Sequence, residues 1–180
     1  MTTIKTEPLA PSGTWQLDPV HSTIAFQIPY LVGTFKGSFR RVEATLGVSE
    51  EGATLTGSAD VESVDVKDEN LAAHLQSPEF FDVERHPQLH FRSTSVERSG
   101  DDLHVGGEIT IKGVTKPIEL RGRIGQPLTD AFGRERLGIE LGTRLDRTDF
   151  GLNWNLPLPT GKPALGDEVE LQAELYFVRG

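Results

Sequence analysis

The sequence predicts an all-β protein, an extended eight-stranded antiparallel β-barrel with one short helical segment at about residues 67–81. The first observation is that apolar and polar residues alternate over eight or nine stretches of the chain, which is typical of half-buried strands. The second is that glycine-containing turns separate these stretches. An open sheet of this size would leave unprotected edges, and closure into a barrel removes them. An eight-stranded barrel has room for packed side chains or for one small ligand.

Each predicted strand has one apolar face. The pattern is clearest in VELQAELYF near the C-terminus, where every second residue from Val169 to Phe177 is apolar. The same period covers the stretches 24–30, 42–48, 55–61, 89–96, 103–111, 118–124 and 137–145. The stretch IKGVTKPI predicts a tight hairpin in which Gly113 takes a positive φ.

One stretch, VKDENLAAHLQ, has a helical period instead. Leu71, His74 and Leu75 fall on one helix face, and Asp68 is placed to cap the first turn. The SPEFF that follows predicts a further short turn, where the helix gives way to the sheet.

Composition restricts the partners and the organisation of the protein. The formal net charge is -9 and the basic residues are dispersed, which argues against nucleic acid or an anionic membrane surface as the main partner. The chain has no cysteine, so disulfides, thiolate metal sites and cysteine nucleophiles are excluded. No run of about 18 apolar residues is present, so no stable membrane insertion is expected. Residues 1–13 lack the apolar core of a secretory signal, and we predict a flexible arm followed by a single domain over 14–180, in the cytoplasm.

Sequence motifs give no support for a metal, nucleotide or nucleophile site. His86 and His90 would lie roughly 13 Å apart along the predicted strand, too far to share an ion. The GxSxG of a nucleophile elbow is missing, and GGEITIKG lacks the Lys-Ser/Thr of a phosphate-binding loop. Asp146 and Asp149 are read as residues that flank a turn. We therefore predict no catalytic residue, no metal and no cofactor.

Five stretches carry a resemblance to a known family: WQLDPVHSTIAF, GTFKGSF, HLQSPEFFDVERHPQLHFRSTSV, GEITIKGVTKPIEL and RTDFGLNW. Together, and in this order, they resemble the YceI-like family of lipocalin-like polyisoprenoid-binding proteins. The resemblance implies a lipocalin-like barrel around an apolar tunnel that takes the tail of a polyisoprenoid or a similar lipid, such as an isoprenoid quinone or a fatty amide. It implies a binding or carrier protein without an established reaction, and a homodimer.

The hydrophobic ligand is expected to lie among inward-facing aromatic and aliphatic side chains. The predicted tunnel lining is Phe26, Ile28, Tyr30, Phe39, His74, Phe81, Leu89, Phe91, Ile109, Ile111 and Trp154. Phe80 and Phe81 are adjacent, so their rings point in different directions. We predict that one ring packs under the helix and that Phe81 faces the ligand.

The chain departs from the family pattern at two places that concern a polar head group. Tyr30 stands where the family often has a histidine at the end of the first long strand. Leu71 and Ala72 stand where it often has Arg-Asp before the retained His-Leu. Tyr30, His74 or Arg147 remain candidates for holding a head group.

Two alternatives stay open beside the carrier. An isomerase, cyclase or dehydratase would use the same cavity and would need an acid–base group inside it, for which His74, His21 and Asp149 are candidates. A non-enzymatic scaffold with a filled core would have no continuous cavity.

Overall fold

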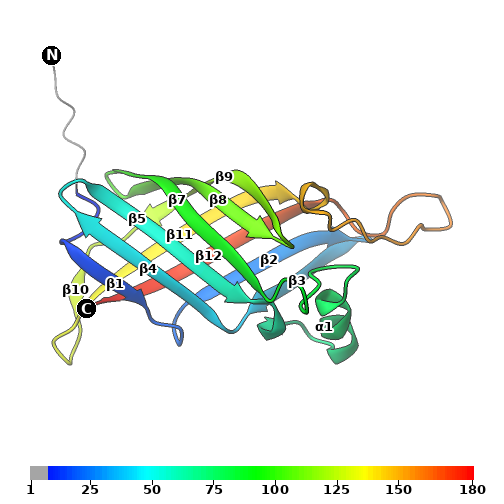
Figure 1. Cartoon of the computed structure of the whole chain (residues 1–180), viewed down its shortest axis with the longest axis horizontal. Coiled ribbons are helices and arrows are strands. Elements are labelled where there is room, and N and C mark those ends of the chain that lie inside the picture. Colours follow the sequence, from blue (N-terminus) through cyan, green and yellow to red (C-terminus); the bar gives the residue numbers. More distant parts are fainter. Residues whose placement is uncertain (1–7) are drawn as a thin grey trace, which may run out of the picture.

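A closed β-sheet forms the wall of the protein (Figure 1). The structure is a computed structural model and describes residues 8–180. The strands are β1 (Gly13–Leu17), β2 (Thr23–Tyr30), β3 (Gly33–Phe39), β4 (Val42–Ser49), β5 (Gly52–Asp60), β6 (Val64–Asp65), β7 (Gln88–Ser99), β8 (Asp102–Ile111), β9 (Val114–Ile124), β10 (Leu128–Thr129), β11 (Glu135–Asp146) and β12 (Glu168–Arg179). The helices are η1 (Val61–Ser63), α1 (Glu69–Gln76) and η2 (Arg147–Phe150), of which η1 and η2 are 3₁₀ turns. Eight strands close in the order β11-β9-β8-β7-β5-β4-β1-β12, with β12 pairing back to β11. The predicted eight-stranded antiparallel barrel is therefore confirmed.

Strand β12 gives the barrel two different ends. Along one edge it pairs with β11 over its whole length. The other edge is shared, because β1 pairs with the C-terminal end of β12 and β2 pairs with its N-terminal half. The β2–β3 hairpin therefore extends the wall beyond β1, toward α1 and the loop that follows η2 (Figure 1). We call this the helix end, and the opposite end, where the C-terminus lies, the closed end.

Tightly packed side chains fill the closed end. Trp15, Leu46, Val105 and Phe177 have 0% exposure and belong to one apolar cluster. They come from four different wall strands, so their contacts tie β1, β4, β8 and β12 together across the barrel. Large side chains buried in this way contribute about 1.5–3 kcal/mol each to the stability of the fold. The interior at this end is a packed core.

The segment before β1 also packs against the closed end. Leu9 is 5% exposed and Ala10 is 8% exposed, within the same apolar cluster. The indole Nε1 of Trp15 donates to the Pro11 oxygen at 3.0 Å, and Nη1 of Arg98 donates to the Leu9 oxygen at 3.0 Å. Residues 1–7 of the predicted flexible arm lie outside the described part of the chain. From Leu9 onward, apolar burial and these two hydrogen bonds hold the segment against the barrel.

The barrel closes through a short contact between β9 and β11. The two strands pair only from Arg121 to Ile124 on β9, opposite Ile139 to Gly142 on β11. Gly122 lies in this contact, where a Cβ atom would overlap the backbone oxygen of Glu140. Only glycine lets the two backbones approach this closely.

A glycine also explains why periodicity missed β3, one of the strands outside the predicted stretches. β3, with the sequence GTFKGSF, was not among the predicted strands because Gly37 interrupts the apolar positions of Phe35 and Phe39. In the structure Gly37 lies opposite Phe26 on β2, and a Cβ there would be 2.5 Å from the Phe26 ring. The Phe26 ring occupies the space that a side chain at position 37 would need.

The predicted helical segment at about 67–81 is found as α1, followed by a hydrogen-bonded turn. Asp68 caps the helix by accepting from the Leu71 N–H at 3.0 Å, as predicted. The helix ends at Gln76, and the Ser77 hydroxyl bonds back to the His74 oxygen at 2.6 Å. Among residues 8–180, no helix is long and apolar enough to cross a membrane.

Arg136 joins two carboxylates near the closed end. Its Nη1 lies 2.9 Å from Asp18 Oδ2 and its Nε lies 2.7 Å from Asp130 Oδ2, while His21 Nδ1 lies 2.7 Å from the same Asp18 oxygen. The hydrogen bonds from His21 and then Arg136 lower the pKa of Asp18 from 3.8 to about 2. The hydrogen bond from Arg136 is also the main reason why the pKa of Asp130 falls to about 2.

Acid is expected to destabilise the protein through this cluster. Because the folded-state pKa of Asp18 lies below its unfolded value, its ionised form stabilises the fold above pH 3.8, and this stabilisation is lost as the pH falls toward about 2. Asp18→Asn should therefore lower the free energy of unfolding at neutral pH and flatten its pH dependence across that window. Urea unfolding followed by circular dichroism checks this. The exposed turn variant Glu50→Gln is the control, and an equal effect in both variants would contradict the assignment.

Candidate functional site

A large apolar cavity occupies the helix-end half of the barrel. Its volume is about 390 Å³, within the range of roughly 300–1,000 Å³ that small-molecule sites span. Side chains from the wall strands, from α1 and from the segments after α1 and η2 line it. We call it the barrel cavity. Because the closed end is filled, it is a pocket with a blind end rather than a tunnel that runs through the barrel.

The structure brings all the predicted lining residues to the barrel cavity. Those that border it are Phe26, Ile28, Tyr30, Phe39, His74, Phe81, Leu89, Phe91, Ile109, Ile111 and Trp154. They converge because strand alternation turns every second side chain inward, and closure of the sheet brings these inner faces together. Their contact with a ligand stays a prediction.

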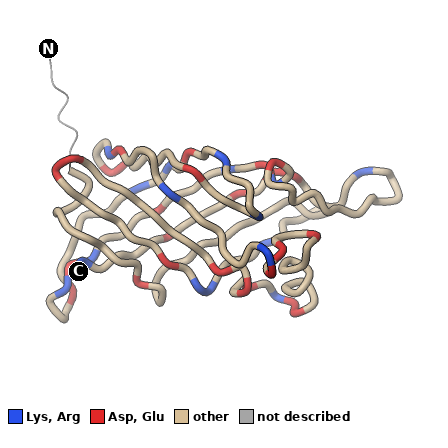
Figure 2. Tube along the Cα trace, viewed as in Figure 1, with Lys and Arg blue, Asp and Glu red and all other residues tan. Residues whose placement is uncertain are grey.

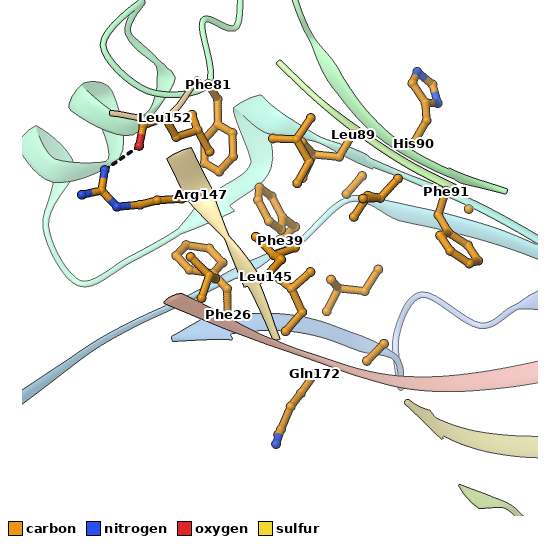
Figure 3. Close-up of a pocket in the computed structure, with 18 of the residues that line it drawn as sticks. Phe26, Phe39, Phe81, Leu89, His90, Phe91, Leu145, Arg147, Leu152 and Gln172 are labelled. Atoms are coloured by element: carbon orange, nitrogen blue, oxygen red, sulfur yellow. Dashed lines mark hydrogen bonds between the residues drawn. The ribbon is translucent and has the colours of Figure 1, made fainter. Parts of the chain in front are cut away.

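Aromatic rings form one side of the cavity. Phe26 packs against Phe35 and Phe39 at centroid distances of 6.1 and 5.7 Å, and Phe39 meets the Phe81 ring edge-on at 6.0 Å. Figure 3 shows Phe26, Phe39 and Phe81 grouped with Leu89 and with side chains from the opposite wall. Edge-to-face and tilted pairs of this kind hold rings in fixed positions. The cavity wall is therefore shaped before any ligand arrives.

Phe91 and Ile109 line the cavity from two neighbouring strands. They are cross-strand partners on β7 and β8, and both are partly buried. The Phe91 ring lies over Gly107, where a Cβ atom would be 2.6 Å from it. His90, the neighbour of Phe91, points away from the cavity in Figure 3, as does Gln172. The alternation therefore keeps polar side chains out of this part of the pocket.

Phe80 and Phe81 take different positions beside the cavity. Phe80 is 7% exposed and packs in a cluster with His74 and Trp154, at centroid distances of 4.9 and 5.4 Å. Phe81 is less buried and contacts Phe39 inside the barrel. Both rings border the cavity.

His74 has a carboxylate partner that the sequence did not indicate. Its Nε2 lies 2.5 Å from Glu79 Oε2, and its ring stands perpendicular to Trp154 at a centroid distance of 4.6 Å. The hydrogen-bonded turn after α1 brings Glu79 back beside His74. His74 is thus held at the rim of the cavity by a charged and an aromatic contact. The other two acid–base candidates, His21 and Asp149, do not border the cavity.

Arg147 is buried at the helix end, with its side chain 3% exposed. Its Nη1 donates to the Leu152 oxygen at 2.5 Å and to the Trp154 oxygen at 2.8 Å, and its Nε donates to the Gly166 oxygen at 2.8 Å. Burial lowers the pKa of Arg147, while the nearby Asp167 raises it. In Figure 3 the guanidinium points away from the apolar side chains and toward Leu152. Arg147, a candidate for holding a head group, instead uses these donors to hold the loop after η2.

Several lining residues were not among the predicted set. They include Ile24, Phe35, Leu55, Leu71, Leu75, Phe80, Ile118, Leu120, Leu141, Leu145, Leu152, Leu165, Val169, Leu171 and Leu175. Most of them lie on inward positions of predicted strands or on the predicted helix face. The same periodicity could therefore have identified them as lining residues. Leu152 and Leu165 lie in an irregular segment, where no period marks the inner side.

Comparisons with known proteins agree with this fold. Residues 15–177 match the family described as the YceI-like domain. Protein YceI of Salmonella arizonae is 33% identical over 144 residues, covering 76% of this chain and 73% of that protein. A UPF0312 protein of Pectobacterium atrosepticum is 31% identical over 140 residues, with the same coverage of both chains.

Solved structures show the same architecture. The crystal structure of Burkholderia cenocepacia BcnA superposes with a TM-score of 0.74 at 19% identity, covering 89% of this chain and 98% of that one. A polyisoprenoid binding domain from Saccharophagus degradans superposes with a TM-score of 0.70 at 14% identity, covering 92% and 98%. The structural likeness establishes the shared barrel, and the match over nearly the whole domain establishes the relationship. The chain belongs to the YceI-like domain family.

Proposed function

We propose that the protein is a carrier that holds the apolar tail of a polyisoprenoid or a similar lipid in the barrel cavity. The observation that carries the proposal is a preformed cavity of about 390 Å³ whose wall is built almost wholly from aliphatic and aromatic side chains. The printed description of the Saccharophagus degradans structure as polyisoprenoid binding adds support. Isoprenoid quinones and fatty amides fit the same requirement for a long apolar tail.

Burial of the tail supplies most of the favourable free energy of the proposed binding. Each methylene removed from water contributes about 0.8 kcal/mol. About ten of them give roughly 8 kcal/mol, which offsets much of the association cost of about 4–15 kcal/mol. Aromatic contacts already formed in the free protein reduce the ordering cost further. A tail in this cavity therefore needs no charged partner inside the barrel.

Native mass spectrometry with organic extraction of freshly purified protein tests the carrier function. We expect a bound lipid of defined mass, or uptake of added polyprenol or isoprenoid quinone by protein that was stripped beforehand. Protein that carries no lipid and takes up neither compound would rule the carrier out.

Filling the cavity with a larger side chain is expected to block uptake. Ile109→Trp places an indole among the lining residues and should reduce polyprenol uptake by about tenfold or more, because roughly two methylenes of contact are lost. Uptake is measured by extraction and mass spectrometry, and the fold is checked by far-UV circular dichroism. Phe91→Trp, on the partner strand, should act in the same direction.

Glu108→Trp is the matched control for the blocked cavity. Glu108 precedes Ile109 on β8, faces outward and pairs with Arg92 at 3.1 Å on the surface. Such an exposed ion pair contributes about 0–1 kcal/mol, so its loss leaves the fold intact. Uptake should match that of the unmodified protein. Equal uptake by Ile109→Trp and Glu108→Trp would show that Ile109 does not line the binding site.

A second candidate function rests on the His74–Glu79 pair. A histidine held by a carboxylate at the edge of an apolar pocket is the arrangement of a general base, which an isomerase, cyclase or dehydratase would need. Chromatography of polyprenols recovered after incubation would reveal a product. Turnover that His74→Ala abolishes, with uptake retained, would favour the enzyme over the carrier.

A further inference from the structure

Two loops at the helix end are joined into one surface. They are residues 28–35, around the tip of the β2–β3 hairpin, and residues 152–166, which follow η2. We call them the helix-end loops. The Leu31 N–H donates to the Ala164 oxygen at 2.9 Å, and the Gly166 N–H donates to the Pro29 oxygen at 2.8 Å. The two segments therefore present their side chains together, at the end of the barrel that holds the cavity (Figure 1).

The helix-end loops expose large apolar side chains. Val32 is 107% exposed, Leu156 is 55%, Leu31 is 54% and Tyr30 is 45%. Leu31 has a φ of 52°, in the left-handed region that leucine rarely adopts. Four of the eight large hydrophobic residues exposed in residues 8–180 are thus gathered on two loops that touch each other. Exposed apolar groups that cluster in this way mark contact with a partner or a membrane.

The helix-end loops also differ from the rest of the chain in charge. The chain carries 27 acidic residues and a net charge of -9, yet residues 28–35 contain no charged residue. Residues 152–166 contain one, Lys162, which is exposed. Figure 2 shows the long loop uncharged apart from this one basic position, whereas acidic residues mark many of the other turns. A surface without carboxylates can approach lipid head groups without repulsion from phosphate.

The same loops reach inward to the barrel cavity. Tyr30, Trp154 and Leu165 lie on them and border the cavity, while Leu31, Val32 and Leu156 face solvent. The exposed apolar surface is therefore continuous with the apolar pocket. Tyr and Trp are also the residues enriched where proteins meet the membrane–water boundary.

We propose that the helix-end loops dock on the surface of a neutral lipid bilayer, with Leu31, Val32 and Leu156 entering the boundary between head groups and acyl chains. Amphipathic elements that bind in this way enter to a depth of about 5–10 Å. Docking places the cavity against the bilayer, so that an apolar tail passes between them without crossing water. Membrane docking is a separate property from tail binding, and vesicle binding can be measured without any tail ligand.

Co-sedimentation with phosphatidylcholine vesicles tests the docking. The unmodified protein should pellet with the vesicles in both low and high salt, because the contact is apolar. Val32→Glu combined with Leu156→Glu should reduce the bound fraction by about tenfold or more, since two apolar side chains no longer enter the bilayer. Neither side chain is buried, so the variant keeps the fold.

Phe132→Glu is the matched control. Phe132 is 85% exposed in the loop between β10 and β11, at the closed end (Figure 1), and the same change there should leave vesicle binding intact. Unmodified protein that stays in the supernatant would overturn the proposal, as would equal loss of binding in the control. Light scattering adds a third outcome. A dimer that dissociates in the double variant, without vesicle binding, would assign the surface to a second copy and overturn membrane docking.

Discussion

Arg147→Met is expected to lower the free energy of unfolding by about 3 kcal/mol or more. The substitution removes the donors that pair with three backbone oxygens, those of Leu152, Trp154 and Gly166. A buried acceptor left without a partner costs about 1–3 kcal/mol. Methionine fills a similar volume, so the expected loss comes from the unpaired oxygens rather than from a void. Urea denaturation followed by circular dichroism measures it.

Arg144→Met, near the end of β11, provides the comparison. Its side chain is 71% exposed, and its Nη1 lies 3.4 Å from Glu168 Oε1 on the surface. Exposed pairs of this kind contribute about 0–1 kcal/mol. If both arginine variants lost equal stability, the loop contacts of Arg147 would not be what stabilises the helix end. Arg147→Lys is expected to restore little, because an ammonium group cannot reproduce the planar fork that reaches three oxygens.

Gly122→Ala is the second substitution with a large expected effect. The added Cβ would overlap the Glu140 oxygen, which belongs to the backbone and has no freedom to rotate away. β9 must then shift away from β11 at the only place where these strands pair. Forced backbone shifts cost about 1–3 kcal/mol, and the loss of barrel closure places this variant at the upper end of that range. We expect faster hydrogen exchange in β9 and β11 as well as a lower urea midpoint.

Gly125→Ala is the control for barrel closure. Gly125 follows β9 directly, and a Cβ there would lie 3.7 Å from the Gly138 oxygen, an ordinary contact. The free energy of unfolding should change by less than about 0.5 kcal/mol. Similar hydrogen exchange in both variants would mean that the β9–β11 contact does not limit the stability of the wall.

Most of the barrel strands could be predicted from the sequence because they are long and have one face exposed to solvent. The inner side chains then repeat with period two, and closure of the sheet brings Phe26, Phe91 and Ile109 to one cavity. The pattern did not predict β3, because position 37 is a glycine where an inward apolar side chain would be expected. The ring of Phe26, on the neighbouring strand β2, fills that space. Periodicity cannot reveal a space that a residue on another strand fills.

The rest of the site depends on contacts that have no local signature. Glu79 meets His74 only because the turn after α1 folds back, and Arg147 is directed to Leu152 and Gly166 by a loop without regular structure. The sequence indicated His74 and Arg147 as polar residues near the cavity, but it indicated neither Glu79 nor the backbone oxygens that Arg147 contacts. The predicted cytoplasmic location and homodimer concern properties outside a single chain, and both stay predictions.

The filled closed end has a consequence for the range of molecules that the pocket accepts. Leu55, Leu141 and Leu175 border the cavity and also belong to the apolar cluster that fills the closed end. They form the floor of the cavity, so a tail that enters at the helix end cannot pass through the barrel. Affinity should then rise with each added carbon until the tail reaches the floor, and level off for longer chains. Carbons beyond that depth stay outside with the head group. The depth of this floor therefore sets the longest tail that can be fully buried, and inner residues of β5, β11 and β12 determine that depth.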